Sequence, residues 1–419
     1  MTGPREFFEQ VAATHRRCFW LDGGGARQWS GRRSIIGWLE EDDVSLTFDA
    51  ARRTVVRHAN GTAEVVGEDI FDALEAELAA GEPTDQWFGY FGYACRTDLA
   101  ALTAPPDGPA EVPDAVWMRS RNVRLFDHEP GLDALAGRPA RPAELNDVVP
   151  EEYAAAFARV QEHLHAGNSY EVNLTYRWET TSDLAPAAAY LRLRELNPAP
   201  YAGFLQHDVP GHEAWLLSSS PERYALVTDD RRLETKPIKG TTARGETPDE
   251  DAVLRFRLSS EPKFRAENLM IVDLLRNDLA MVCEPGSVAV PVLMEVESYA
   301  TVHQLVSTVR GRLADGVTTV GALRTLFPAG SMTGAPKRRT MEIIGEVEST
   351  ARGAYAGAFG WVAADGRADL GVVIRSLTTT GDGRYVLGTG GGITVHSDVA
   401  EEHAESSWKA ERLLRVFGD

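Results

Sequence analysis

The sequence predicts an α+β fold in which a large layer of β-sheet is covered by helices. Segments with strand character outnumber those that a strict alternation of strand and helix would give, which disfavours a doubly wound parallel fold. Residues 170–178 alternate apolar and polar side chains, as a half-buried strand does. Residues 151–166 instead repeat apolar side chains at helical spacing.

The elements follow one another along the whole chain. Residues 1–128 combine strand patterns with short helices, and a stretch rich in Pro, Ala and Gly follows at 129–150, typical of a linker or of a surface loop. The helix at 151–166 ends at Gly167-Asn168, before the strand at 170–178. Later strand patterns occupy 214–219, 223–228, 287–293, 301–310, 354–363, 370–377 and 384–388. Helical patterns occupy 186–196, 249–257, 262–281, 318–326, 337–347 and 398–417.

The composition excludes several classes of protein. The 419 residues are 43% hydrophobic and 25% charged, with 43 Lys and Arg against 62 Asp and Glu, a formal net charge of −19. This charge disfavours nucleic acids and anionic membranes, and an anionic substrate would need local cations or a bridging metal. Three widely spaced cysteines, no apolar run of membrane-spanning length and no signal-peptide core favour a cytoplasmic protein.

The helix at 262–281 carries polar groups on its apolar stripe. Glu267, Asn268 and Asp278 lie on the same stripe as Ile271. A carboxylate facing a core needs an ion pair, hydrogen bonds or a metal. A structural pair, for example with Arg276, is therefore the alternative to a functional site.

The last helix has a similar face. Glu402, Glu405 and Lys409 lie together, and the face becomes apolar toward the C-terminus. A surface pair between Glu405 and Lys409 is one explanation, and a cleft lined by the polar half is the other, which we favour. Two helices aiming carboxylates inward predict a magnesium site with few protein ligands.

Two glycine-rich segments, 327–337 and 387–393, precede predicted helices. Glycine runs let backbone N–H groups approach an anion, but a flexible turn between strand and helix accounts for them too. The first segment lacks the glycine before Lys337 that a phosphate-binding loop requires, which disfavours nucleotide binding. No cysteine lies in a nucleophile-elbow setting, so a built-in glutaminase is not expected.

Several motifs follow in register from about residue 150 to the C-terminus. They are Ser219–Arg223 (SSPER), Pro237–Thr241 (PIKGT), Glu267–Asp278, Phe327–Lys337, Gly390–Ile393 and the face formed by Glu402, Glu405 and Lys409. In these motifs the chain resembles the chorismate-utilising enzymes, which include anthranilate synthase large subunits, isochorismate and salicylate synthases, and aminodeoxychorismate synthase component I. Residues 15–127 match more loosely, through 30–37 and 88–93.

This resemblance implies a fold and a division of the chain. The fold would be two large antiparallel sheets packed face to face, with helices outside, as in anthranilate synthase component I. Residues 1–145 would contribute strands to this sandwich. Residues 146–419 would form the chorismate-binding catalytic domain.

The resemblance also implies roles for individual residues. Glu267 and Glu405 would bind Mg²⁺, with Glu402 in contact directly or through water, and one chorismate carboxylate would bridge to the metal. His303 would lie beside the substrate ring as a catalytic residue. The other substrate contacts would come from Tyr355, Arg375, Lys409, Thr241, Ser331, Thr333 and the backbone amides of Gly390 and Gly392.

Lys239 decides which reaction the resemblance implies. At this place in the PIxGT motif, anthranilate and isochorismate synthases carry a small residue, whereas aminodeoxychorismate synthases carry lysine. The lysine would add to C2 of chorismate and expel the C4 hydroxyl, protonated by Glu222; ammonia would then add at C4 and expel the lysine. The pKa of Lys239 must therefore fall, and burial should raise the pKa of Glu222.

The expected product is 4-amino-4-deoxychorismate, the precursor of 4-aminobenzoate, made with ammonia from a separate glutamine amidotransferase. One alternative is an anthranilate synthase large subunit, which Lys239 opposes. The other is an inactive scaffold that binds an amidotransferase, which the intact acidic residues oppose.

Two positions depart from the family pattern. Phe264 replaces an acidic residue of many relatives, which should weaken the outer shell of the metal. Glu171 stands where many relatives have glutamine and salicylate synthases have a lysine base, which argues against isochorismate chemistry. The segment 19–24 also lacks the serine of tryptophan-inhibited relatives, so tryptophan binding is not expected.

Overall fold

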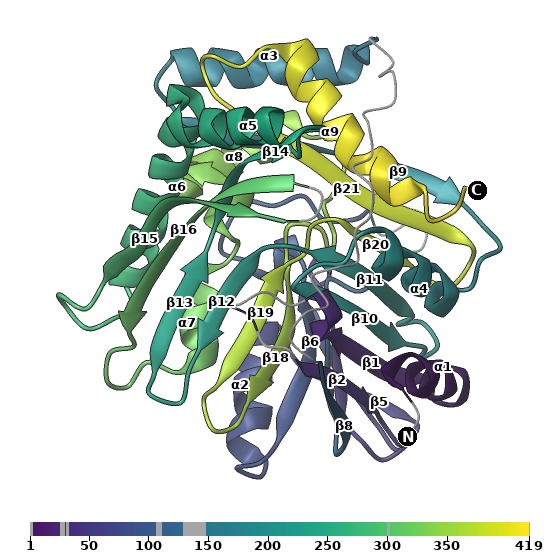
Figure 1. Ribbon diagram of the computed structural model, residues 1–419. Coiled ribbons are helices and arrows are strands. Elements are labelled where there is room, and N and C mark those ends of the chain that lie inside the picture. The colour runs from purple at the N-terminus through teal and green to yellow at the C-terminus, as the bar shows by residue number, and fades with distance from the viewer. Residues whose placement is uncertain are drawn as a thin grey trace.

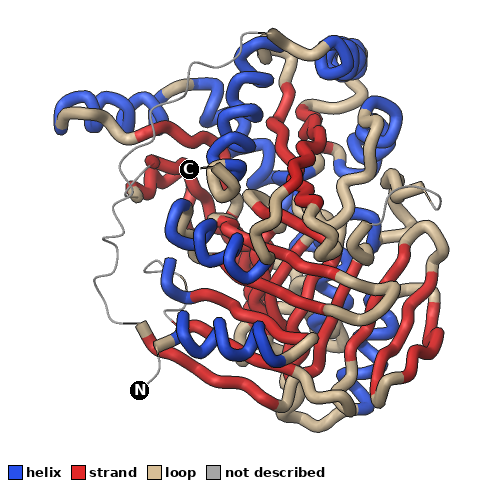
Figure 2. Tube along the Cα trace, turned by 90° about the vertical axis from the view of Figure 1, so that its right-hand side faces the viewer, coloured by secondary structure: helices blue, strands red, loops and turns tan. Residues whose placement is uncertain are grey.

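Two large antiparallel sheets pack face to face, and helices cover their outer faces (Figure 1; Figure 2). This computed structural model describes residues 3–25, 30, 33–105, 111–128, 148–299 and 302–418. The α+β sandwich is therefore confirmed. The boundary between 145 and 146 lies outside the described residues, and the division into two parts stays a prediction.

The nine-stranded sheet joins strands from both ends of the chain, and its neighbouring strands are all antiparallel. β1, β2 and β8 come from the first 128 residues and extend the sheet beyond β10. In order across the sheet the strands are β17 (Gly334–Ala335), β9 (Glu171–Thr181), β21 (Arg384–Ile393), β20 (Ser376–Thr379), β11 (Ala214–Ser220), β10 (Tyr201–His207), β1 (Arg17–Asp22), β2 (Arg33–Trp38) and β8 (Asn122–Asp127).

The twelve-stranded sheet also combines N-terminal and C-terminal strands. In order its strands are β14 (Ile238–Ala243), β16 (Val302–Arg312), β13 (Arg232–Lys236), β12 (Arg223–Val227), β19 (Ala368–Val372), β18 (Ala358–Ala363), β6 (Gln86–Phe91), β7 (Ala115–Arg119), β3 (Ser45–Asp49), β4 (Thr54–Ala59) and β5 (Thr62–Gly67). β15 (Ala289–Ser298) pairs with β16 outside this order. The strands of the first 128 residues are thus shared between the two sheets.

Apolar faces of the helices cover the sheets. α1 (Pro4–Thr14), α4 (Pro186–Leu196) and α9 (Val399–Leu414) share a core cluster with strands of the nine-stranded sheet. α2 (Ile70–Ala80), α6 (Pro262–Ala280) and α7 (Thr319–Leu326) do so with the twelve-stranded sheet. α3 (Glu151–His165) and α8 (Lys337–Val347) pack on β9 and β21, and α5 (Pro248–Ser260) lies against β14 and β15. No helix in these described ranges is long and apolar enough to cross a membrane.

A third core cluster lies between the two sheets and holds them together. Phe19 of β1 stacks on Phe88 of β6 with ring centroids 4.0 Å apart, and Leu216 of β11 and Phe359 of β18 join them. In each of these strands, the side chains at every second position face the other sheet. A slip of one residue in the pairing would therefore turn them away from the core, which fixes the register.

Several sequence-based boundaries are wrong. The predicted strand at 370–377 is two strands, β19 and β20, which belong to different sheets. The strand predicted from 354 begins only at 358. The glycine run at 387–393 is no turn, because β21 continues through it to Ile393 and pairs with β9. Glycine has low strand propensity, so pairing with a neighbour decides this segment.

Strands β10, β13 and β14 were absent from the sequence prediction. β13 and β14 are polar, and Pro237 separates them. Some of their polar side chains have tertiary partners, as when Lys236 donates to Glu297 at 2.7 Å. Apolar alternation is therefore too weak a signal for strands of this kind.

The buried carboxylate of Asp278 has a structural explanation, as the alternative interpretation of its helix proposed. Its partner is not Arg276, which pairs with Asp273 at the surface, but Lys337 at the start of α8, at 2.7 Å. Lys337 also donates to the backbone oxygen of Leu326, at 2.6 Å. The pair ties α6 to the segment before α8.

Three histidines form a cluster where the two sheets meet near β3. The ring of His58 lies 4.6 Å from that of His212 and 5.4 Å from that of His207. Hydroxyls of Thr47 and Ser45 lie 2.9 Å from Nε2 of His58 and His207. Burial lowers the pKa of His207 to about 3 and that of His58 to about 4, assisted by the neighbouring histidines and Arg17.

We predict that this cluster makes the fold sensitive to mild acid. A histidine with a lowered folded pKa contributes stability that is complete above its unfolded pKa and lost as the pH falls below it. The lowered pKa of His207 alone should reduce the free energy of unfolding by about 2 kcal/mol at pH 5 relative to pH 7.5. Urea unfolding of the wild type and His207→Gln at both pH values measures this cost.

The variant should lose less stability than the wild type between the two pH values, whatever its absolute stability. His165→Gln, at the exposed end of α3, is the matched control and should follow the wild type. Equal losses in all three proteins would contradict the prediction.

Candidate active site

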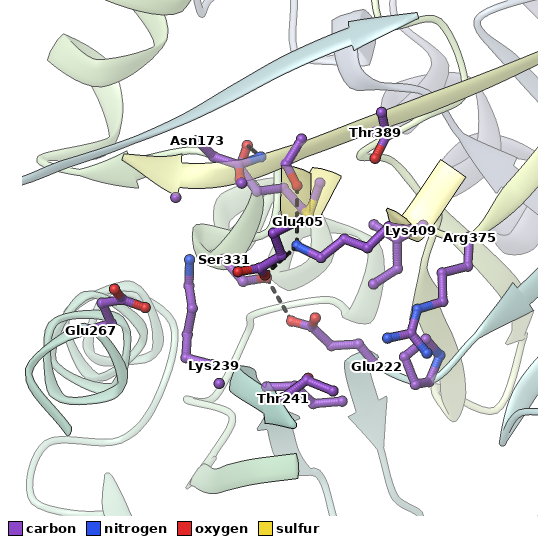
Figure 3. Close-up of a pocket in the computed structure, with 18 of the residues that line it drawn as sticks. Asn173, Glu222, Lys239, Thr241, Glu267, Ser331, Arg375, Thr389, Glu405 and Lys409 are labelled. Carbon is purple, nitrogen blue, oxygen red and sulfur yellow. Dashed lines mark hydrogen bonds and ion pairs between the residues drawn. The ribbon is translucent and has the colours of Figure 1, made fainter. Parts of the chain in front are cut away.

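One cleft collects most of the predicted functional residues (Figure 3). Its walls come from β9, β14, α6, β21 and α9, together with the connections before β12, β18, α8 and β20. Of the predicted residues, those that line it are Glu222, Lys239, Thr241, Glu267, Ser331, Tyr355, Arg375, Gly390, Gly392, Glu402, Glu405 and Lys409.

Thr333 and His303 are not part of the cleft wall. Thr333 is buried, and its hydroxyl donates to the backbone oxygen of Gly330 at 3.3 Å. His303 has both ring nitrogens engaged, with Asp251 at 3.0 Å and Ser298 at 2.8 Å. His303 pairs in register with Thr242 of β14, so it supports the strand that carries Lys239. We therefore expect His303 to position that strand. Its hydrogen bonds do not favour direct contact with a substrate.

Glu222 is a buried acid. It lies in the turn between β11 and β12 and is 5% exposed. Burial raises the pKa of Glu222 to about 7, although the Ser331 hydroxyl, which donates to it at 2.6 Å, and Lys239 favour its ionised form. It can therefore give up or take a proton near neutral pH.

Lys239 projects from β14 into the cleft (Figure 3). Its amine donates a hydrogen bond to Glu171 of β9. Burial lowers the pKa of Lys239, but the charges of Glu171, Glu267 and Glu222 outweigh burial and raise it above its ordinary value. The pKa of Lys239 is therefore raised in the substrate-free chain, where a fall was expected, because the carboxylate of Glu171 lies against the amine.

The neighbour of Lys239 explains its strand geometry. Gly240 has φ +95°, a conformation that a residue with a side chain rarely adopts. A Cβ there would lie 3.0 Å from Leu258 and 3.2 Å from Phe264. Phe264 thus fills space beside the PIKGT strand and lines the cleft.

Three carboxylates line the cleft from α6 and α9. Glu267 makes no hydrogen bond or ion pair within the described ranges, and burial raises its pKa to about 7. Glu402 accepts hydrogen bonds from Ser397 at 2.8 Å and Lys263 at 3.3 Å. The charge of Lys409, 2.8 Å away, lowers the pKa of Glu405.

This donor set fits a hard cation. Within the described part of the chain, no three acidic, His or Cys side chains converge on one point as a complete ligand set. Glu267 is nonetheless an unpartnered, partly buried carboxylate across the cleft from Glu405 (Figure 3), a charge that a cation would compensate. Two or three carboxylates with remaining positions open is the arrangement in which Mg²⁺ keeps waters or substrate oxygens.

The cleft also holds an unpaired cation. Arg375 lies where the chain leaves β19 in one sheet and enters β20 in the other, with φ +50°. Its guanidinium has no partner among the described residues, and burial, with Arg412 nearby, lowers its pKa to about 10. Lys409 of α9 donates to the backbone oxygen of Gly390 at 3.3 Å and pairs with Glu405 at 2.8 Å. An unpaired buried guanidinium is a receptor for a carboxylate.

Sequence reasoning missed the contribution of β9 to the cleft. The strand was expected to be half-buried, with its polar face in water, but residues 171–175 are buried on both faces. Asn173 from the polar face lines the cleft and donates to the backbone oxygen of Met332 at 3.3 Å. The alternation marked the correct face, and the contacts of that face with Lys239, Met332 and Glu348 show that it is covered.

The comparisons with known proteins agree with this geometry. Residues 16–415 match the chorismate binding enzyme family. An aminodeoxychorismate synthase of Streptomyces pristinaespiralis is 40% identical over 95% of this chain and 61% of its own length. Aminodeoxychorismate synthase component 1 of Klebsiella aerogenes is 38% identical over 78% of this chain and 76% of its own.

A solved structure, anthranilate synthase component I from Streptococcus pneumoniae TIGR4, superimposes with a TM-score of 0.75 at 27% identity, covering 93% of each chain. The chain therefore belongs to the chorismate-binding enzymes. It spans 61% of the length of the Streptomyces pristinaespiralis relative.

We predict that Ser331→Ala raises the pKa of Glu222 further above its ordinary value. The variant removes the hydroxyl that stabilises the carboxylate while leaving the burial that destabilises it. Infrared difference spectra recorded against pH follow the protonated carboxyl band, and Glu222→Gln identifies that band.

Ser349→Ala is the control, because Ser349 bonds to Glu152 on an exposed surface. It should leave the titration unchanged. A Glu222 band that titrates at the same or a lower pH in Ser331→Ala would contradict the prediction.

Proposed function

We propose that this chain aminates C4 of chorismate to give 4-amino-4-deoxychorismate, as an aminodeoxychorismate synthase component. The observation that supports this most directly is a lysine amine, Lys239, inside a cleft that also holds the acid Glu222 and the unpaired cation Arg375. The names of the curated relatives point the same way. A small residue at 239 would instead favour an anthranilate synthase.

Each of these residues has a separate role in the proposed reaction. Lys239 adds through Nζ to C2 of the substrate, and Glu222 protonates the C4 hydroxyl, which leaves as water. Ammonia then adds at C4, and the bond between C2 and Lys239 breaks. Arg375 and Lys409, assisted by Tyr355 and backbone amides of β21, hold a carboxylate of the substrate.

Mg²⁺ is the cofactor that we propose for this cleft. Glu267 and Glu405 would hold it, with Glu402 next to them. When bound, Mg²⁺ supplies positive charge that orients a carboxylate of the dianionic substrate.

A separate glutamine amidotransferase is the proposed source of ammonia. The designation "component 1" of the Klebsiella aerogenes relative implies a second component for that protein. The three cysteines of this chain are all buried, which gives them no role as glutaminase nucleophiles.

We predict that Lys239→Ala loses formation of the 4-amino product. The loss should exceed the ~10²–10⁴-fold typical of a proton-transfer group, because the variant removes the covalent nucleophile. A small amount of 2-amination or anthranilate formation should replace it, since C2 becomes open to ammonia. The measurement is product mass and ring-proton NMR with chorismate, Mg²⁺ and ammonium salt.

Lys236→Arg is the control, because Lys236 pairs with Glu297 outside the cleft and the charge is kept. It should retain activity. Near wild-type formation of the 4-amino product by Lys239→Ala would exclude Lys239 as the nucleophile. A wild type that makes only anthranilate would overturn the proposed function itself.

We predict that Mg²⁺ binding depends on the two helices that face each other across the cleft. Glu267→Gln and Glu405→Gln should lose the calorimetric Mg²⁺ signal and amination, with their melting temperatures unchanged in EDTA. Glu401→Gln should bind normally, because Glu401 lies exposed on the same helix as Glu405. Full turnover of the wild type in excess EDTA would refute the metal assignment.

A further inference from the structure

Glu171 is a buried carboxylate beside the cleft, in contact with Lys239, and it has no role in the reaction proposed above. It lies on β9 with its side chain 1% exposed, and one oxygen, Oε1, accepts a hydrogen bond from Lys239. The other oxygen, Oε2, is buried without a hydrogen-bond partner in the described ranges. Burying a carboxylate oxygen without a partner costs free energy, so packing alone does not explain Glu171 at this position.

The backbone of β21 is shaped to admit this pair. A Cβ at Gly392 would lie 2.2 Å from Oε1 of Glu171 and 3.0 Å from Nζ of Lys239. Gly392 pairs with Asn173, next but one to Glu171 on β9. Three strands that are distant in sequence, β9, β14 and β21, thus enclose one amine and one carboxylate.

Other charged groups also surround Lys239. Glu222 faces it from the turn before β12, Glu267 from α6 and Glu405 from α9, and Lys263 lies beyond Glu267. Only Glu171 forms an ion pair with Lys239 among the described residues. Glu171 is therefore the carboxylate that lies within hydrogen-bond distance of Lys239 and can accept its proton.

We propose that Glu171 takes the ammonium proton of Lys239 when the substrate is bound and returns it at the end of the cycle. This inference rests on the proposed function. Lys239 as an ammonium cannot attack, because its nitrogen has no free electron pair. Transfer of the proton to Oε1 gives a free amine and a neutral carboxylic acid, the form that burial tolerates better.

The cycle balances with the groups already named. The free amine forms a bond to C2 as the C4–O bond breaks, and the proton of Glu222 leaves with the hydroxyl as water. Ammonia bonds to C4, the C2–N bond to Lys239 breaks, and Glu222 recovers a proton from the new ammonium group. Glu171 then returns its proton to Lys239, so that chorismate and ammonia give the amino product and water.

Glu171→Gln tests the proposal, because an amide keeps the shape and can accept a hydrogen bond but cannot take the proton. The quantity to measure is the ratio of wild-type to variant kcat between pH 6.5 and 9, in which changes of free ammonia cancel. We expect a ratio of about 10² at pH 6.5 that shrinks about tenfold per pH unit and levels off near one above about pH 8.5, since the lysine of the variant must lose its proton to solvent. Glu179→Gln on the same strand, exposed and paired with Arg384, should give a ratio near one throughout.

A readout that does not depend on turnover accompanies the kinetics. Labelling of Lys239 by a small amine-reactive reagent, followed by peptide mass spectrometry, should reach its half-maximal rate at a lower pH in Glu171→Gln. A kcat ratio that is independent of pH, or that is already near or below one at pH 6.5, would overturn the proposal, and so would an unchanged labelling profile. If the wild type makes no 4-amino product, the proposed function fails, and the labelling still tests whether Glu171 controls the protonation of Lys239.

Discussion

The pairing of β9 with β21 holds the cleft together. Their register is fixed over ten residue pairs, from Val172 with Ile393 to Thr181 with Arg384. At Gly392 the absence of a side chain leaves room for Lys239 and Glu171, and at Gly388 a Cβ would lie 2.2 Å from the ring of Tyr355. α9 follows β21 directly and brings its carboxylates and Lys409 back over the strand. A shift of one residue would place side chains where these groups now lie.

A chain of net charge −19 needs a local arrangement to bind a dianionic substrate. In Figure 3, Glu267 and Arg375 stand at opposite ends of the cleft, and the ion pair of Glu405 with Lys409 on α9 lies between them. Burial sets the character of each group: Glu222 and Glu267 titrate near neutral pH, and Arg375 keeps its charge without a partner. The cleft therefore offers both positive and negative groups to a molecule that spans it.

The first 128 residues take part in supporting the cleft. Arg352 donates to the backbone oxygens of Met332 and Asn173, both at 2.7 Å, and so joins two walls of the cleft. Glu348 binds Arg352 through both carboxylate oxygens, and the guanidinium lies 4.4 Å from the ring of Tyr93. An aromatic side chain from the first 128 residues therefore packs against the ion pair that joins these walls.

The sequence alone determined the helices at 151–166, 262–281 and 398–417, the family, and many residues of the cleft, because helical periodicity and motif spacing are local properties of the chain. Only the tertiary structure decided that the glycine run is part of a strand, that 370–377 divides between two sheets at Arg375, and that Asp251 and Ser298 hold the ring of His303. It also decided that the carboxylate of Glu171 helps to raise the pKa of Lys239. A pattern in one segment reports whether that segment is buried, but the pKa of a buried amine depends on which distant carboxylate is packed against it, and here that carboxylate lies 68 residues away, in Glu171.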